Sequence, residues 1–303
     1  MLSVIIPSYN EEEIIRKTAL ELSRTLDEAD IEYELIFVDD GSKDSTWTII
    51  KQMANTNLAI HGLQFSRNFG KESAIFAGLR AAKGDCAVVI DCDLQHPPMK
   101  IPEMYKLWKE EGYEIVEAIK SNRGKESKFH SWAANCFYSI ISKTTNINMS
   151  NASDFKLLDR KVIVTLINMP ENQAFFRALS SWVGYKTTQI PFEVAEREAG
   201  VSKWSTLSLI KYALINITSF SSAPMQIVTL LGTIMLFTSI ILSIVSIYQK
   251  FAGIALGGFT TVILIMLFAS SIIMISLGII GFYIAKIYEE IKGRPKYIIS
   301  QQV

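Results

Sequence analysis

Two long uncharged apolar runs near the end of the chain constrain its fold more than any other feature. Residues 225–249 carry no charge, and the 24-residue stretch MQIVTLLGTIMLFTSIILSIVSIY within them would reach about 36 Å as a helix. A second uncharged run, residues 251–285, is too long for one crossing and breaks naturally at Gly257-Gly258. Because a bilayer's hydrocarbon core is about 30 Å thick, we expect two transmembrane helices, at about 225–248 and 259–285. Buried helices of a soluble core would be shorter.

The charges around these runs predict how the chain is oriented in a membrane. The connector between the runs offers only Lys250, whereas four basic residues lie in the tail, residues 286–303. By the positive-inside rule we expect an inner-membrane, multi-pass protein with its first domain, its tail and both termini in the cytoplasm. Lysines and arginines equal the acidic residues, 30 against 30. This balance argues against nucleic acid as a partner.

Residues 204–224 separate the first domain from the first apolar run. Apolar residues recur there at helical spacing, while Lys211 lies on another side: Leu207, Ile210, Leu214 and Ile217. This pattern favours an amphipathic helix lying in the membrane interface. A packed surface helix is the alternative.

The remaining residues, 1–203, read as one α/β domain. Short β-branched runs alternate with amphipathic stretches, which is typical of βαβ units and a mostly parallel sheet. We expect strands at Ser3–Ile6, Glu34–Val38, Ile60–Phe65, Ala87–Ile90 and Glu114–Ala118, and helices near Glu12–Ala29, Ser45–Ala54, Glu72–Ala82 and Ile101–Glu111.

Polar side chains follow four of these strands at the point where each strand ends. The clusters are Pro7-Ser8-Tyr9-Asn10-Glu11, Asp39-Asp40-Gly41-Ser42, Ser66-Arg67-Asn68-Phe69-Gly70-Lys71 and Asp91-Cys92-Asp93-Leu94-Gln95. In open α/β sheets ligands bind in the crevice outside the carboxyl ends of the strands. We therefore expect the four clusters to converge on one site.

Asp91 and Asp93 flank a single residue after a buried strand. Two carboxylates at this spacing can share a hard divalent cation, Mg²⁺ or Mn²⁺, with Gln95 as a neutral oxygen ligand. Such an ion takes its other ligands from water and substrate phosphates, which suits a nucleotide diphosphate. A D-x-D motif alone is also found in solvated turns, and the neighbouring clusters favour the metal.

The other clusters indicate a nucleotide site of a particular kind. Asp39 is placed to accept hydrogen bonds from a base or ribose, and Asp40 to shape its turn and cap the next helix. Lys71 and Arg67 supply positive charge for a diphosphate, although either could form a surface ion pair. The chain lacks the glycine-rich dinucleotide, P-loop and G-x-S-x-G motifs, so those chemistries do not fit.

As a set, several motifs resemble a known family: VIIPSYNEEE, FVDDGSKDST, FSRNFGKESAIFAGL, DCDLQHPP, SDFKLLDR and EREAGVSKW. They are similar to the family-2 glycosyltransferases with a GT-A fold, and more narrowly to the polyprenyl-phosphate glycosyltransferases. The resemblance covers nearly the whole chain, including the paired apolar runs. It is specific for the group, not for the sugar.

This resemblance implies a role for each matching residue. Pro7, Tyr9, Glu11, Asp39, Lys71 and Asp91 would bind the nucleotide sugar, and Asp91, Asp93 and Gln95 the metal. Asp154 matches the family's proposed catalytic aspartate. Four basic residues match positions that grip phosphate groups of acceptor or donor: Arg123, Lys128, Arg197 and Lys203. Arg197 and Lys203 are the stronger matches, and we place them with Asp154 among the catalytic residues.

The implied reaction moves a sugar from a nucleotide onto undecaprenyl or another polyprenyl phosphate, with inversion. A UDP-sugar is the expected donor and glucose the first expectation; N-acetylhexosamine, mannose and a 4-amino-arabinose derivative stay open. A homo-tetramer and a flippase for the product are further implied partners. Two alternatives remain: a processive polysaccharide synthase, which would carry Q-x-x-R-W where this chain has Gln173 and Arg177, and an inactive membrane scaffold.

Overall fold

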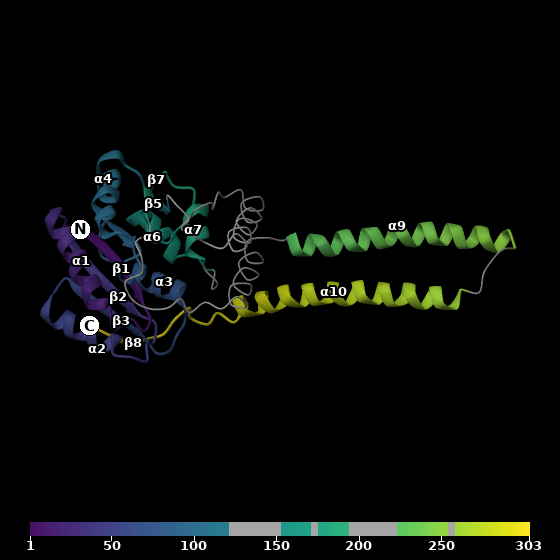
Figure 1. Ribbon diagram of the computed structural model, residues 1–303, viewed down its shortest axis with the longest axis horizontal. Coiled ribbons are helices and arrows are strands. Elements are labelled where there is room, and N and C mark those ends of the chain that lie inside the picture. The colour runs from purple at the N-terminus through teal and green to yellow at the C-terminus, as the bar shows by residue number, and fades with distance from the viewer. Residues whose placement is uncertain (121–152, 171–174, 194–222, 254–257) are drawn as a thin grey trace. The chain divides into compact units, whose positions relative to one another are not determined.

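The chain folds into two compact units (Figure 1). One unit comprises Met1–Leu209 together with Arg294–Val303, and the other comprises Ile210–Gly293. The computed structural model describes residues 1–120, 153–170, 175–193, 223–253 and 258–303.

The first unit holds the sheet and its helices. In chain order its elements are β1 (Leu2–Ser8), α1 (Ile15–Glu28), β2 (Tyr33–Asp39), α2 (Thr46–Thr56), β3 (Ile60–Phe65), α3 (Lys71–Ala81), β4 (Cys86–Val89), η1 (Pro98–Lys100), α4 (Ile101–Glu111), β5 (Ile115–Lys120), β6 (Lys156–Asp159), α6 (Arg160–Ile167), α7 (Phe176–Trp182), β7 (Thr187–Phe192) and β8 (Ile299–Gln302).

Eight strands form one sheet in the order β7-β5-β6-β4-β1-β2-β3-β8. β1 pairs in parallel with β2 and β4, β2 with β3, and β5 with β7. β6 runs antiparallel to β4 and β5, and β8 runs antiparallel to β3. The parallel strands therefore point their carboxyl ends at one edge of the sheet, as the sequence predicts.

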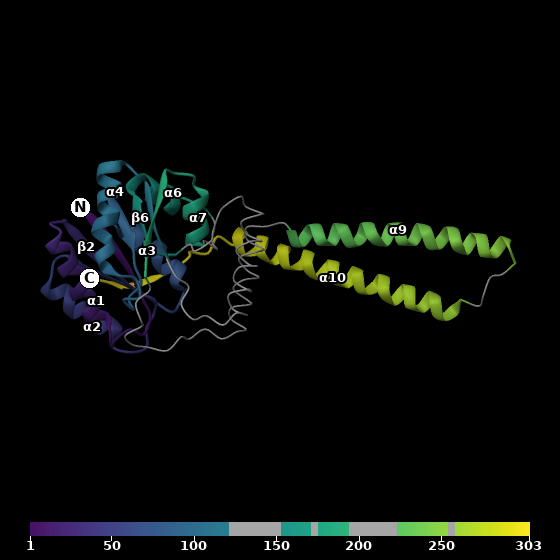
Figure 2. The ribbon, with the colours of Figure 1, turned by 45° about the horizontal axis from the view of Figure 1, so that its top comes forward.

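The central strands are buried on both faces, which explains their nearly continuous apolar sequences. Along β1, Val4 and Ile6 belong to the same core cluster as Trp47 of α2 and Met104 of α4, whereas Ile5 between them points to the opposite face. Helices pack around the sheet in both views (Figures 1 and 2). The predicted mostly parallel α/β domain is confirmed, and every predicted strand and helix of residues 1–118 is present within a few residues.

Strand β8 was not predicted: from the sequence we expected residues 286–303 to form a tail without a strand. It adds to the free edge of β3, where Gly62 and Val303 exchange both backbone hydrogen bonds. The Tyr297 ring stacks on Phe65 with centroids 5.1 Å apart, and the Trp47 indole N–H donates to Gln301. The end of the chain thus covers a sheet edge that would otherwise be open.

The second unit consists of two long apolar helices, α9 (Ala223–Phe251) and α10 (Phe259–Ile291). Val228–Phe251 and Ile265–Ile291 are long and apolar enough to cross a membrane, and neither segment is buried within the protein. The expectation of two such helices is confirmed. The predicted end of the second helix, Ala285, is six residues short, because lysine and glutamate continue the helix until Gly293, whose φ of +58° stops it.

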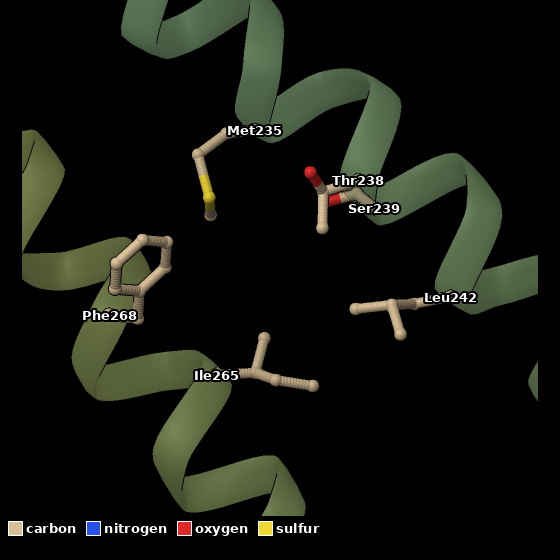
Figure 3. Close-up of a pocket in the computed structure, with 6 residues that line it drawn as sticks. All are labelled: Met235, Thr238, Ser239, Leu242, Ile265 and Phe268. Atoms are coloured by element: carbon tan, nitrogen blue, oxygen red, sulfur yellow. The ribbon is translucent and has the colours of Figure 1, made fainter.

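A pocket lies between these two helices (Figure 3). It is lined by Met235, Thr238, Ser239 and Leu242 of α9 and by Ile265 and Phe268 of α10. Its lining is mostly apolar, and the Thr238 hydroxyl donates to the Ile234 carbonyl of its own helix.

The cysteines that the structure describes, Cys86 and Cys92, are buried and free. Cys136 and the predicted interfacial segment up to residue 222 lie outside the described residues.

Candidate active site

The loops after β1, β2 and β3 meet at the carboxyl edge of the sheet and are joined by hydrogen bonds. Backbone N–H groups after β1 donate to the loop after β2: Asn10 to the Ser42 hydroxyl at 2.8 Å and Glu11 to the Thr46 hydroxyl at 2.9 Å. Pro7 lies in β1, and Tyr9 and Glu11 follow that strand half-buried. The segment that follows β1 is thus joined, through Asn10 and Glu11, to the loop that follows Asp39.

Asp39 is fully buried at the end of β2 and shapes the loop that follows it. Its carboxylate accepts the Ser42 N–H at 3.0 Å and the Gln64 side-chain amide at 3.1 Å. Both bonds fix the carboxylate at the last position of β2.

Asp40 connects the loop after β2 to the loop after β3. Its carboxylate accepts the backbone N–H groups of Phe69 and Gly70 and so holds the loop after β3. The prediction that Asp40 caps the next helix, α2, is therefore wrong. Burial is the main reason that the pKa of Asp40 rises to about 6, against these two hydrogen bonds. Gly41 has φ +68°, and a Cβ there would lie 2.5 Å from the Arg67 carbonyl carbon, so only glycine allows the two loops to meet.

Lys71 joins the third and fourth strand ends. It begins α3, and its ammonium lies 2.6 Å from Asp91 Oδ1 and 2.7 Å from Asp154 Oδ2. Asp91 follows β4, and Asp154 precedes β6. The structure therefore brings three of the predicted site residues into direct contact.

Asp154 is held by a second cation that the sequence did not reveal. Arg177, on α7, donates from Nε to Asp154 Oδ1 at 2.7 Å and from a terminal nitrogen to Oδ2 at 2.9 Å. Burial disfavours the charge of Asp154, yet Arg177 and Lys71 together hold its pKa well below the usual range. Burial likewise opposes the charge of Asp91, and Lys71 lowers its pKa. Asp154 is thus a permanent carboxylate and a poor proton acceptor.

Glu72, next to Lys71, positions the helix that carries Arg177. Its carboxylate accepts the Phe176 N–H at 2.8 Å, at the start of α7. Burial and the nearby charge of Asp154 raise the pKa of Glu72 to about 7. At the other end of the helix, the buried Lys156 ammonium donates to Ser180 at 2.9 Å.

His96 lies beside the acidic cluster without acting as a cation. It is 6 % exposed, stacks on Phe155 and accepts the Asp91 N–H at 3.4 Å through Nδ1. Burial lowers its pKa, which keeps the ring neutral. It supports the turn that carries Asp91.

The D-x-D segment offers hard oxygen donors for a divalent cation. Asp93 is 8 % exposed and accepts the Gln95 N–H at 3.1 Å, while Asp91 Oδ1 already holds the Lys71 ammonium. Within the described residues no three His, Cys, Asp or Glu side chains could enclose a metal by themselves. Two carboxylates and an amide oxygen fit an open site that substrate phosphates and water complete.

Four of the predicted residues fall outside the part of the chain that the structure describes. Arg123 and Lys128 lie within residues 121–152, and Arg197 and Lys203 within residues 194–222. Their roles stay predictions. Arg177 and Glu72 show no motif spacing of their own; the only signal was the partial match of residues 173–177 to Q-x-x-R-W.

The chain is similar to known proteins over its full length. It is 37 % identical over 305 residues to the prophage bactoprenol glucosyl transferase homolog of Escherichia coli (strain K12), covering 99 % of this chain and 98 % of that protein. Identity to the bactoprenol glucosyl transferase of Shigella phage SfII is 36 % over 305 residues, covering 99 % and 97 %. The uncharacterized glycosyltransferase YkcC of Bacillus subtilis (strain 168) is 38 % identical over 301 residues, covering 99 % and 93 %.

The fold also has a counterpart among solved structures. Glucosyl-3-phosphoglycerate synthase from Mycobacterium tuberculosis, in complex with Mn²⁺, uridine diphosphate and glucosyl-3-phosphoglycerate, superposes with a TM-score of 0.50 at 20 % identity, covering 71 % of this chain and 79 % of that one. The likeness shows a GT-A fold. The model of the family described as Glycosyl transferase family 2 matches residues 3–179. With this match and full-length relatives above one-third identity, the chain belongs to glycosyl transferase family 2 and is a glycosyltransferase.

Proposed function

We propose that this enzyme transfers a sugar from a nucleotide diphosphate sugar to the phosphate of a polyprenyl lipid, with inversion at the anomeric carbon. The observation that carries the proposal is the Lys71–Asp91–Asp154–Arg177 cluster at the carboxyl edge of a GT-A sheet, in a chain with two helices that could span a membrane. Two full-length relatives named bactoprenol glucosyl transferase support the lipid acceptor, and they make UDP-glucose the first donor to test.

In this proposal the donor lies across the ends of β1 to β4. Pro7, Tyr9, Glu11 and Asp39 would hold the nucleoside, with Lys71 near the diphosphate. Asp91, Asp93 and Gln95 would hold Mg²⁺ or Mn²⁺. A divalent cation bound there would neutralise the charge that develops on the leaving diphosphate.

The electrostatics of Asp154 define its part in the reaction. A phosphate monoester has a second pKa of about 6, so the acceptor is already mostly dianionic at neutral pH and needs no strong general base. Asp154 is fixed as a carboxylate by two cations, which does not suit it to accept a proton. We assign it the role of orienting Lys71 and Arg177 beside the reacting centre.

An acceptor dianion must approach a site rich in carboxylates. Basic side chains are needed to offset that repulsion, and Arg123, Lys128, Arg197 and Lys203 are proposed to supply them. The lipid chain stays in the bilayer because moving it into water costs about 0.8 kcal/mol per CH₂. We propose that α9 and α10 span the membrane and that both termini are cytoplasmic.

Release of nucleoside diphosphate by the detergent-purified protein tests the proposal. UDP-glucose, UDP-N-acetylglucosamine and GDP-mannose are each supplied with Mg²⁺, Mn²⁺ or a chelator, with and without undecaprenyl phosphate. We expect release from one donor that requires both lipid and metal, and its loss when the metal is chelated. Release that needs a soluble glycan acceptor, or that ignores the lipid, would overturn the proposal.

A further inference from the structure

The Lys71 ammonium forms ion pairs with two carboxylates, those of Asp91 and Asp154. The two differ in the other cations that lie beside them. Asp154 also accepts two hydrogen bonds from Arg177, at 2.7 and 2.9 Å. Asp91 has Lys71 at 2.6 Å, and a second basic side chain, that of His96, lies 3.9 Å from its carboxylate with Nδ1 accepting a hydrogen bond. Among the described residues, Lys71 is therefore the cation on which Asp91 depends.

We propose that Lys71 is an exchangeable counter-cation of the D-x-D site. In the empty enzyme its ammonium occupies Asp91 Oδ1, and it leaves this oxygen when a divalent cation and the donor diphosphate bind. The diphosphate then becomes its new partner. This inference rests on the proposed function, because it assumes that the D-x-D segment binds a metal.

Geometry makes the two cations exclusive at this oxygen. A divalent ion such as Mg²⁺ binds a carboxylate oxygen at about 2.0–2.1 Å, and the ammonium already lies 2.6 Å from that oxygen. An ammonium and a dication bound to one oxygen would stand within a few ångströms of each other, where their repulsion is strong. A dication that binds Oδ1 therefore has to displace the ammonium from it.

Lys71 can leave without disrupting the cluster. Its side chain is 41 % exposed, whereas that of Asp154 is 5 % exposed and stays paired with Arg177. A lysine side chain has four flexible carbons, so its ammonium can move while its backbone remains at the start of α3. When Lys71 leaves, the metal neutralises the negative charge of Asp91 in its place.

Exchange of this kind couples metal binding to nucleotide binding. A metal that arrives alone must displace Lys71 into water, while a metal that arrives with a diphosphate gives the lysine a new anionic partner. Each ligand then raises the affinity for the other by the same factor. Removing the lysine ammonium removes the competitor and the part of the coupling that the lysine supplies, while direct contact between diphosphate and metal remains.

Binding of Mn²⁺ to the full-length protein in detergent tests the proposal, followed by the electron paramagnetic resonance signal of free Mn²⁺ with and without UDP. For wild type we expect weak binding that UDP tightens by about tenfold or more. Lys71→Met should bind Mn²⁺ without UDP about tenfold more tightly than wild type, and UDP should tighten its Mn²⁺ binding by a smaller factor than in wild type, since only direct contact of the diphosphate with the metal remains. Lys71→Arg keeps a cation and should resemble wild type.

Two controls locate the effect. Lys106→Met removes an exposed lysine of α4 and should leave Mn²⁺ binding unchanged. Asp91→Asn added to Lys71→Met should abolish the gain, which places it at the D-x-D segment. Lys71→Gln is measured beside Lys71→Met, with thermal unfolding of both, so that a folding defect in one variant does not decide the outcome.

Two results would overturn the proposal in distinguishable ways. If UDP promotes Mn²⁺ binding to wild type but Lys71→Met and Lys71→Gln bind the free ion no more tightly, Lys71 is not a competitor and the proposed function stands. If neither wild type nor the variants bind Mn²⁺ even with UDP, the metal assignment fails and the exchange proposal fails with it.

Discussion

Replacing Glu72 by glutamine should stabilise the protein at alkaline pH and leave it nearly unchanged at acidic pH. Burial, followed by the charge of Asp154, raises the pKa of Glu72 from 4.5 to about 7. A carboxyl group with a raised pKa favours the folded state fully below pH 4.5, and this contribution is lost as the pH rises through 7. A rise of this size corresponds to about 3 kcal/mol of destabilisation at pH 8.5. Glutamine keeps an oxygen for the Phe176 N–H and never ionises.

Thermal unfolding in detergent, followed by tryptophan fluorescence at pH 5 and pH 8.5, measures this effect. At pH 8.5 the variant should unfold several degrees above wild type, since about 3 kcal/mol shifts Tm by that much in a domain of this size. Glu103→Gln, on the exposed face of α4, serves as the matched control and should show no pH-dependent difference. A lower Tm for Glu72→Gln at pH 8.5, or the same shift at both pH values, would refute the claim that ionised Glu72 is unfavourable.

Three further changes test the contacts around the site and the sheet edge. Arg177→Met removes both Arg177 hydrogen bonds to Asp154. The kcat for nucleoside diphosphate release should fall about a hundredfold, which raises the activation barrier by roughly 3 kcal/mol. An unchanged kcat would show that the Arg177–Asp154 pair has no part in the reaction. Lys156→Met leaves the buried Glu117 carboxylate without its ammonium and should lower the free energy of unfolding by about 3–5 kcal/mol, as measured by thermal unfolding. The double variant Lys156→Met with Glu117→Gln should regain part of this stability. A Lys156→Met variant as stable as wild type would contradict the prediction. Tyr297→Ala removes the stacked ring that holds β8 and should cost about 1 kcal/mol and speed hydrogen exchange in β3 and β8; unchanged exchange would show that the ring does not secure the strand.

The sequence was sufficient to predict how the strand ends converge. Parallel strands point their carboxyl ends at one edge, so the segments after β1 to β4 had to meet once the β-branched runs were recognised as parallel strands. Lys71 and Asp91 were both predicted there for that reason. The two apolar helices followed from length and charge alone.

The contacts that organise the cluster lie outside what spacing can reveal. Arg177 contacts Asp154 from a seven-residue helix, 23 positions along the chain. Glu72 accepts the Phe176 N–H across 104 positions. Neither contact follows the helical or strand spacing from which sequence patterns are recognised. β8 escaped prediction for a related reason: its four residues are exposed, and only the free edge of β3 makes them a strand.

Transfer of radiolabelled glucose from UDP-glucose into an organic phase tests the central claim most directly. The purified protein with undecaprenyl phosphate and Mg²⁺ should place the label on a lipid-soluble product, and Asp91→Asn and Asp154→Asn should abolish this transfer while Glu103→Gln retains it. Label that accumulates in a water-soluble polymer, or an Asp154→Asn variant that works at the wild-type rate, would contradict sugar transfer to a lipid phosphate at this cluster.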